Sequence, residues 1–154
     1  MAARAAALLA GVWAGALLAL AAIAAPLAFA NAARDVAGRI AGQTFALEAR
    51  VGLLIAVVLL LLLRRQARPT GAPVFSTDLM LLLGAVFCTV AGHFALQPML
   101  AAARAGEGSL SFAALHGIAA AFYGVKTLLV LVLAWRLVGT PRAAATSVIP
   151  PLSS

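Results

Sequence analysis

Charged side chains are scarce in this chain of 154 residues: 10% of its residues are Asp, Glu, Lys or Arg, whereas 65% are hydrophobic. Soluble domains carry about 25% charged residues, so the charges present are too few to cover a water-soluble globule of this size. The low charge content therefore excludes a soluble fold.

Cysteine and the motifs of catalysis are also nearly absent. Cys88 is the single cysteine, so an intrachain disulfide is excluded, and its place in an apolar stretch predicts a small packing residue. Cys88, Ser109 and Ser111 lie in no recognisable nucleophile motif, and the chain has no glycine-rich phosphate loop. We therefore predict that the protein is not an enzyme.

What the chain has instead is four long apolar stretches, at residues 5–29, 45–63, 79–97 and 112–137. A hydrocarbon core about 30 Å thick is crossed by roughly 20 apolar residues in a helix. The sequence thus predicts an all-α fold, an integral membrane four-helix bundle over residues 1–137 that is surrounded by the lipid bilayer. Residues 138–154, rich in Pro, Ser and Ala, are predicted to form a disordered cytoplasmic tail.

Two features near the first connection bear on helix length. A helix from Asp35 to Arg65 would be about 45 Å long, so its first turns would project from the membrane or lie along its surface. Pro26, late in the first apolar stretch, is expected to kink or end that helix.

The formal net charge of +7 is unevenly distributed. In a four-span chain, the N-terminus, the second connection and the tail share one side, which holds Arg4, Arg64, Arg65, Arg68, Arg136 and Arg142. The positive-inside rule then places both termini in the cytoplasm. Basic residues beside apolar stretches of this length orient membrane proteins, so no nucleic-acid partner is predicted.

The first 30 residues also match a secretory signal that ends at Ala28-Phe29-Ala30. Their apolar run is about twice as long as a usual signal core, which favours a retained first helix.

Polar side chains inside the apolar stretches are the candidate site, because an ionisable group in lipid is costly and usually faces protein or water. At about 1.5 Å per residue, Glu48 and Arg50 lie about 24 and 21 Å from Arg64. This is the level of His93 in the third stretch and of Tyr123 in the fourth. Lys126 lies nearer mid-membrane, where it pairs with a carboxylate, for which Glu48 is the expected partner, snorkels to the cytoplasmic interface, or becomes neutral. The predicted polar cluster, in the outer half of the bundle, comprises Glu48, Arg50, His93, Gln97, His116, Tyr123 and Lys126, with Gln43 at its edge.

This cluster supports three hypotheses. It binds or passes a small ligand, a proton or an ion, or it is a structural core in a protein that acts through interaction rather than transport. A less favoured alternative is haem or copper bound by His93 and His116, since imidazoles from neighbouring helices ligate both. The sequence has no HxxxH or CxxC motif. The main prediction is therefore that the protein holds no cofactor.

Glycines four residues apart predict close helix contacts. Gly11 and Gly15 lie in the first stretch, and Gly38 and Gly42 lie before the second. We expect Gly11 and Gly15 to form an internal packing face, with homo-oligomer formation as the alternative.

Several segments resemble the bacterial domain-of-unknown-function 4149 family, across most of residues 9–137. They are Trp13–Gly15, Ala25–Phe29, Ala37–Gly42 with Phe45, His93–Met99 and Phe112–Ile118. That family is similar to animal transmembrane protein 205, and the resemblance implies a multi-pass protein of a bacterial inner membrane with four helices and no assigned activity. Drug and metal resistance associated with the animal relatives implies transport or trafficking. Lys126 stands where the family is expected to have a neutral polar residue.

Overall fold

Four long helical segments make up the computed structural model, which describes residues 1–67, 76–107 and 110–139. The segments are Ala2–Asn31, Arg34–Ala67, Thr77–Arg104 and Phe112–Gly139, each long and apolar enough to cross a membrane. The predicted four-span membrane protein is therefore confirmed. The elements are α1 (Ala2–Ala19), η1 (Leu20–Ala24), α2 (Ala25–Asn31), α3 (Arg34–Ala67), α4 (Thr77–Thr89), η3 (Val90–Ala95), α5 (Leu96–Arg104) and α6 (Phe112–Gly139).

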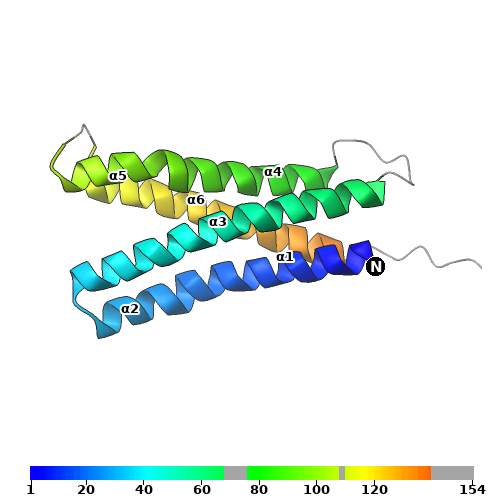
Figure 1. Ribbon diagram of the computed structural model, residues 1–154, viewed down its shortest axis with the longest axis horizontal. Coiled ribbons are helices and arrows are strands. Elements are labelled where there is room, and N and C mark those ends of the chain that lie inside the picture. The colour runs from blue at the N-terminus through cyan, green and yellow to red at the C-terminus, as the bar shows by residue number, and fades with distance from the viewer. Residues whose placement is uncertain (68–75, 108–109, 140–154) are drawn as a thin grey trace, which may run out of the picture.

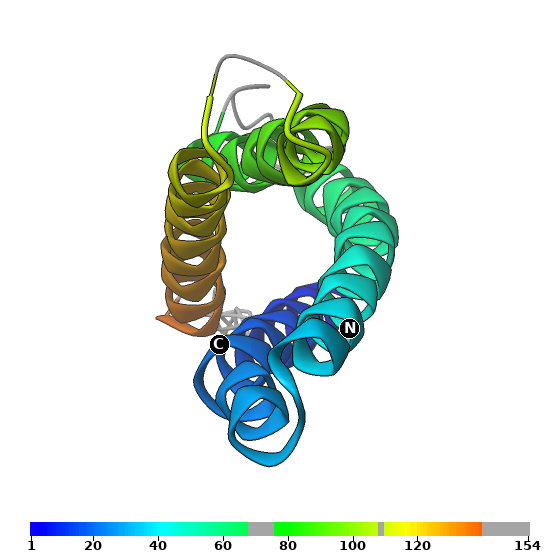
Figure 2. The same ribbon diagram turned by 90° about the vertical axis from the view of Figure 1, so that its left-hand side faces the viewer.

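The helices form a ring in the order α1, α3, α4, α6, as the end-on view shows (Figure 2). Each of α1 and α4 packs against both α3 and α6, so α3 and α6 lie diagonally opposite each other. The N-terminus and the end of α6 lie at one end of the bundle, together with the end of α3 and the start of α4 (Figure 1). We call this the terminal end, and the opposite end, where α2 meets α3 and α5 meets α6, the hairpin end.

The well-buried core occupies the terminal half of the bundle. On α1 the core comprises five residues, each at most 4% exposed to solvent: Ala6, Ala10, Trp13, Ala14 and Leu17. Small residues at this helical spacing let membrane helices approach closely.

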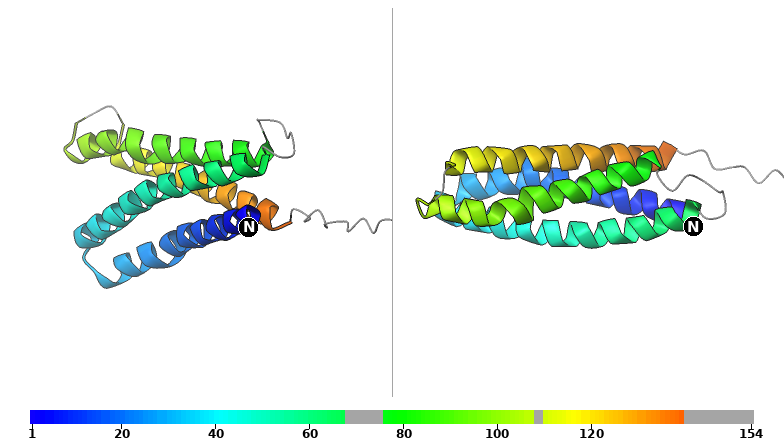
Figure 3. Two further views of the ribbon diagram at one scale, coloured as in Figure 1. Left: turned by 45° about the vertical axis from the view of Figure 1, so that its right-hand side comes forward. Right: turned by 90° about the horizontal axis from the view of Figure 1, so that it is seen from above.

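Toward the hairpin end, burial falls away. Among the described residues beyond the level of Leu17, Glu48, Thr89 and Lys126, those that are buried are Ala37, Leu100 and Leu115. In this half, α2 packs chiefly on α3 and α5 chiefly on α6, and the two hairpins diverge (Figure 3).

The outer surface carries large apolar side chains. Leu8, Leu54, Phe87 and Leu128 are each more than 60% exposed, which is the distribution expected of helices that face lipid. Trp135, at 82% exposure beside Arg136, fits the aromatic anchor typical of a membrane interface.

Two prolines lie inside helical segments instead of ending them. Pro26 follows the π-helical segment η1, and Pro98 follows the π-helical segment η3. Proline lacks an N–H, so the carbonyls four residues earlier, of Ala22 and Phe94, lose their α-helical partner. Both carbonyls lie in the widened turns, which explains why the first segment continues to Asn31 and the third continues past residue 97 to Arg104.

Other predicted boundaries shift or lie outside the described residues. The second segment begins at Arg34, so α3 has 34 residues and a length of about 50 Å. Val138 and Gly139 belong to α6, so the predicted tail boundary at residue 138 was wrong. Residues 140–154 and the turn around residues 68–75 lie outside the described residues.

The prediction that Gly11 and Gly15 form an internal packing face was wrong. Both are exposed, and a Cβ atom built on either meets nothing within 4 Å. A Cβ atom built on Gly38 or Gly42 also meets nothing within 4 Å. The inward side of α1 is set by Ala6, Ala10 and Ala14, which leaves Gly11 and Gly15 on its other side.

The close helix contact of the bundle lies instead at Gly92. A Cβ atom there would come within 2.5 Å of the Phe122 Cβ atom on α6.

Candidate functional site

An ion pair crosses the interior of the bundle. Lys126 Nζ on α6 donates to Glu48 Oε2 on α3 at 2.6 Å, and the two side chains are 4% and 6% exposed. Because α3 and α6 are diagonal neighbours, the pair ties opposite corners of the ring together. Of the alternatives predicted for Lys126, the structure has interior pairing with Glu48 and not snorkelling.

The Lys126 side chain covers the difference in depth between the two residues. Lys126 lies about 15 Å along α6 from Arg136, whereas Glu48 lies about 24 Å along α3 from Arg64. The Cα–Cβ bonds of a helix tilt toward its N-terminus, which for α6 is the hairpin end. The lysine stem therefore extends toward the level of Glu48.

Aromatic side chains surround the pair. Trp13 Nε1 on α1 donates to Glu48 Oε1 at 3.3 Å. The Lys126 ammonium lies 4.6 Å from the centre of the Tyr123 ring, a cation–π contact, and the Tyr123 hydroxyl donates to the Leu17 carbonyl at 2.9 Å.

Gly52, one helical turn after Glu48, leaves room for this arrangement. A Cβ atom at Gly52 would lie 3.0 Å from Glu48 Oε1 and 3.1 Å from Trp13 Nε1. We name Trp13, Glu48, Gly52, Tyr123 and Lys126 the inner cluster.

Hydrogen bonding in the buried interior is complete. Within the part of the chain that the structure describes, every buried side-chain nitrogen or oxygen has a hydrogen-bond partner. The inner cluster contains one carboxylate and one ammonium, so its charges balance when both are ionised. Such a pair is stable in a low-dielectric interior, yet removal of one charge leaves the other uncompensated.

The inner cluster lies where the packed core ends. Toward the terminal end, Val130, Leu133 and Leu137 continue the buried face of α6 below Lys126. Toward the hairpin end, Tyr123 is only half-buried and meets the Phe45 ring edge-on at 5.0 Å. The ion pair thus lies at the boundary between the packed terminal half and the less tightly packed hairpin half.

Four residues of the predicted polar cluster lie apart from the inner cluster. Arg50, Gln97 and His116 are exposed, and His93 is half-buried. The prediction that Arg50 and His93 share a polar layer with Glu48 and Tyr123 was wrong, because depth along a helix does not fix rotation. Arg50 is two residues from Glu48, a turn of about 200°, so it points to the opposite side of α3.

The two histidines have separate surroundings. The ring Nδ1 of His93 shares a hydrogen bond of 3.4 Å with the Gln97 amide on its own helix, while His116 stacks on Phe112 with ring centres 5.8 Å apart. Residues 1–67, 76–107 and 110–139 contain no group of three His, Cys, Asp or Glu that could hold a metal ion. Haem or copper binding stays a prediction.

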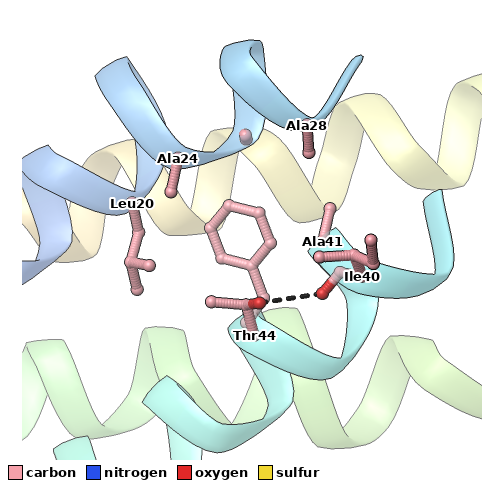
Figure 4. Close-up of a pocket in the computed structure, with 8 residues that line it drawn as sticks. Leu20, Ala24, Ala28, Ile40, Ala41 and Thr44 are labelled. Atoms are coloured by element: carbon pink, nitrogen blue, oxygen red, sulfur yellow. Dashed lines mark hydrogen bonds between the residues drawn. The ribbon is translucent and has the colours of Figure 1, made fainter. Parts of the chain in front are cut away.

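The hollows described in the bundle are apolar and are not lined by the inner cluster. One, of about 50 Å³, lies between the η1–α2 segment and α3, where Leu20, Ala24 and Ala28 face Ile40 and Ala41 (Figure 4). The other, of about 480 Å³, is a groove between α4 and α6. Its lining is Gly84, Phe87, Cys88, Ile118, Ala121, Phe122, Val125 and Leu129.

Trp13 and Gly52 were missed by the sequence predictions. Trp13 lies about 14 Å along α1 from Arg4, close to the distance of about 15 Å between Lys126 and Arg136 along α6. Its equal depth with Lys126, together with an indole N–H that needs an acceptor when buried, was the available signal. Gly52 carried a signal as well, since it lies four residues from Glu48 on the same helix face.

Comparison with known protein families shows which family the chain belongs to. The model of the family described as "Domain of unknown function (DUF4149)" matches residues 8–109. The chain belongs to this family. The DUF4149 match covers Trp13, Glu48 and Gly52, and it ends before Tyr123 and Lys126. No curated protein and no solved structure matched the chain, and the similarity to transmembrane protein 205 stays a prediction.

Proposed function

We propose that this multi-pass membrane protein binds a proton at the Glu48–Lys126 pair and exchanges it with water at the hairpin end. The observation that carries the proposal is the position of a buried ion pair at the end of the packed core. Ionisable residues inside membrane spans commonly mark proton or ion pathways.

The chemistry of the step follows from the two charges. A proton taken from water adds to Glu48 Oε2 and converts the carboxylate to a neutral acid. Lys126 then keeps its positive charge without a counter-ion, and the Tyr123 ring is its remaining electrostatic partner in the inner cluster. The loss of the α3–α6 link favours either release of the Lys126 proton or separation of the two hairpins.

The proposal includes an orientation and a location. The terminal end carries Arg4, Arg64, Arg65 and Arg136, so the positive-inside rule supports cytoplasmic placement of that end. Resemblance to a bacterial family supports the inner membrane. Under this orientation, the inner cluster exchanges protons with the side opposite the cytoplasm.

Proton passage is tested in liposomes that contain purified protein and a pH-sensitive dye, with a membrane potential that drives proton entry. We expect faster acidification with wild type than with Glu48→Gln. Asp35→Asn is the matched control, because it removes an exposed carboxylate at the hairpin end that pairs with Arg39 at 2.9 Å. Equal rates for wild type, Glu48→Gln and protein-free liposomes would contradict passage.

Proton binding without passage is tested by pH-difference infrared spectroscopy. Wild type is expected to gain a carboxylic-acid C=O band on acidification that Glu48→Gln lacks and that Asp35→Asn keeps. A wild-type spectrum without a band sensitive to Glu48→Gln would overturn the proposal.

A structural role is the second candidate, and complete hydrogen bonding of the buried polar groups favours it. Under this hypothesis the ion pair serves to fix which helices oppose each other, and the protein acts through interaction with other proteins rather than transport. A Glu48→Gln, Lys126→Met double variant would then keep every interaction of the wild type. Homo-oligomer formation stays a prediction within this candidate.

A further inference from the structure

Arg50 is a cation within a membrane-spanning helix, and its side chain does not contribute to the buried interior of the bundle. Its side chain is exposed on α3 and, among the described residues, takes part in no ion pair or hydrogen bond. Three other cations of the described helices are matched by carboxylates: Lys126 pairs with Glu48, Arg39 with Asp35 and Arg136 with Asp78. A cation at this depth is stabilised by an anionic partner, and the described residues of the chain do not supply one.

The surface around Arg50 is apolar. Leu47 and Leu54, one turn away on either side, are 61% and 68% exposed, and Val51 is 43% exposed. Gln43, which is also exposed, lies two turns toward the hairpin end on the same face, at a spacing of four and three residues through Leu47. The face therefore combines aliphatic side chains with a cation and an amide donor.

The depth of Arg50 lets its guanidinium reach the level of lipid phosphates. With Arg64 at one edge of a hydrocarbon core about 30 Å thick, Arg50 lies about 21 Å inside and so about 9 Å from the other edge. Its side chain leans toward the N-terminus of α3, which is the nearer edge. Long cationic side chains in this position extend to the headgroups.

The neighbouring helix adds polar groups. The half-buried His93 on η3 shares a hydrogen bond of 3.4 Å with Gln97, which is exposed on α5. These residues belong to the segment that begins with α4, and α4 packs directly against α3.

We propose that Arg50 binds the phosphate of an anionic phospholipid in the leaflet at the hairpin end. Arg50 donates to the phosphate, Gln43 contacts the headgroup, and an acyl chain lies along Leu47 and Leu54. Charge complementarity selects an anionic over a zwitterionic lipid, because no carboxylate of the described residues pairs with Arg50. The inference does not depend on proton binding by the inner cluster.

The test is native mass spectrometry of the full chain in detergent with phosphatidylglycerol or with phosphatidylcholine of the same acyl chains. Wild type should hold phosphatidylglycerol roughly fivefold more tightly, the contribution of one interfacial cation. Arg50→Gln should lose this preference, and Arg50→Lys should keep part of it. Arg39→Gln is the matched control, since it removes the same charge from the same helix.

Three outcomes decide the proposal. Equal preference in wild type and Arg50→Gln overturns it, as does an equal loss in Arg39→Gln, which would indicate a general charge effect. Competition by millimolar inorganic phosphate would point to a free anion as the ligand and would also overturn the lipid assignment. If Arg50→Gln fails to fold, Arg50→Lys decides: full loss of the preference in that folded variant contradicts a phosphate contact based on charge.

Discussion

Glu48 and Arg50 are two residues apart, yet their surroundings are opposite. The Glu48 side chain is buried against Lys126 and Trp13, whereas Arg50 faces outward among exposed aliphatic side chains. A helix turns about 100° per residue, so α3 presents one ionisable residue to protein and the other to lipid. The two residues therefore call for separate experiments.

At the residue scale, a double-mutant cycle measures the coupling in the ion pair. We expect Glu48→Gln and Lys126→Met each to destabilise the protein by about 3 kcal/mol, because each leaves a buried charge unmatched. The double variant should recover most of that loss. Thermal unfolding in detergent measures all four proteins, and additive losses in the double variant would contradict a direct pair.

Trp13→Phe isolates the second hydrogen bond to Glu48. The substitution keeps an aromatic ring in the core and removes the Nε1 donor, so we expect a loss of about 1–2 kcal/mol in unfolding free energy. Trp135→Phe is the control, because Trp135 is 82% exposed. Equal small effects of the two substitutions would show that the 3.3 Å contact contributes little.

Much of the inner cluster was predictable, and the missing part has a physical cause. Glu48 was predicted as the partner of Lys126, although the residue count from the flanking arginines left about 9 Å between the levels of their backbones. The same count placed Arg50 and His93 level with Glu48, but it could not give their rotation, because Ala and Leu on nearly every side of these helices hide which face is inward. Rotation was the missing quantity, and it is set by packing between helices rather than by the local sequence.

At the element scale, the contact between η3 and α6 controls how closely two helices approach. A Cβ atom at Gly92 would meet the Phe122 Cβ atom at 2.5 Å, and neither atom can move without its backbone. Gly84 is more tolerant, since the neighbour at 3.0 Å is the flexible end of Leu129.

Gly92→Ala is therefore expected to destabilise the protein by about 1–3 kcal/mol through overpacking. Gly11→Ala, in open space on α1, should be neutral or stabilising by up to about 1 kcal/mol, because alanine favours helix more than glycine does. Thermal unfolding of both variants checks the pair. A loss at Gly11 as large as that at Gly92 would indicate that the outer face of α1 contacts a partner.

The helices themselves were predicted well and their ends were not. Apolar runs fix which residues cross the lipid, but a helix continues beyond the lipid wherever nothing stops it, as α3 does from Arg34. Neither Pro26 nor Pro98 ends its helical segment, because the π-helical turns before them absorb the unpaired carbonyls.

At the scale of the whole molecule, the proposed orientation of the bundle in the membrane can be tested. In a Cys88→Ala background, a cysteine is placed at Ala105 near the hairpin end or at Ala3 near the terminal end, both exposed positions. A membrane-impermeant maleimide added to intact bacterial cells should label Ala105→Cys and spare Ala3→Cys. The reverse pattern would contradict cytoplasmic termini, and labelling of both only after lysis would contradict a plasma-membrane location.

The level of Glu48 sets how far a bound proton would feel the membrane voltage. With Glu48 about 24 Å into a 30 Å core, a proton from the hairpin side crosses about one fifth of the electric field. Moving one charge through that fraction is worth about 0.5 kcal/mol per 100 mV. Occupancy of this carboxylate would therefore follow the acidity of one compartment and depend only weakly on the energised state of the membrane.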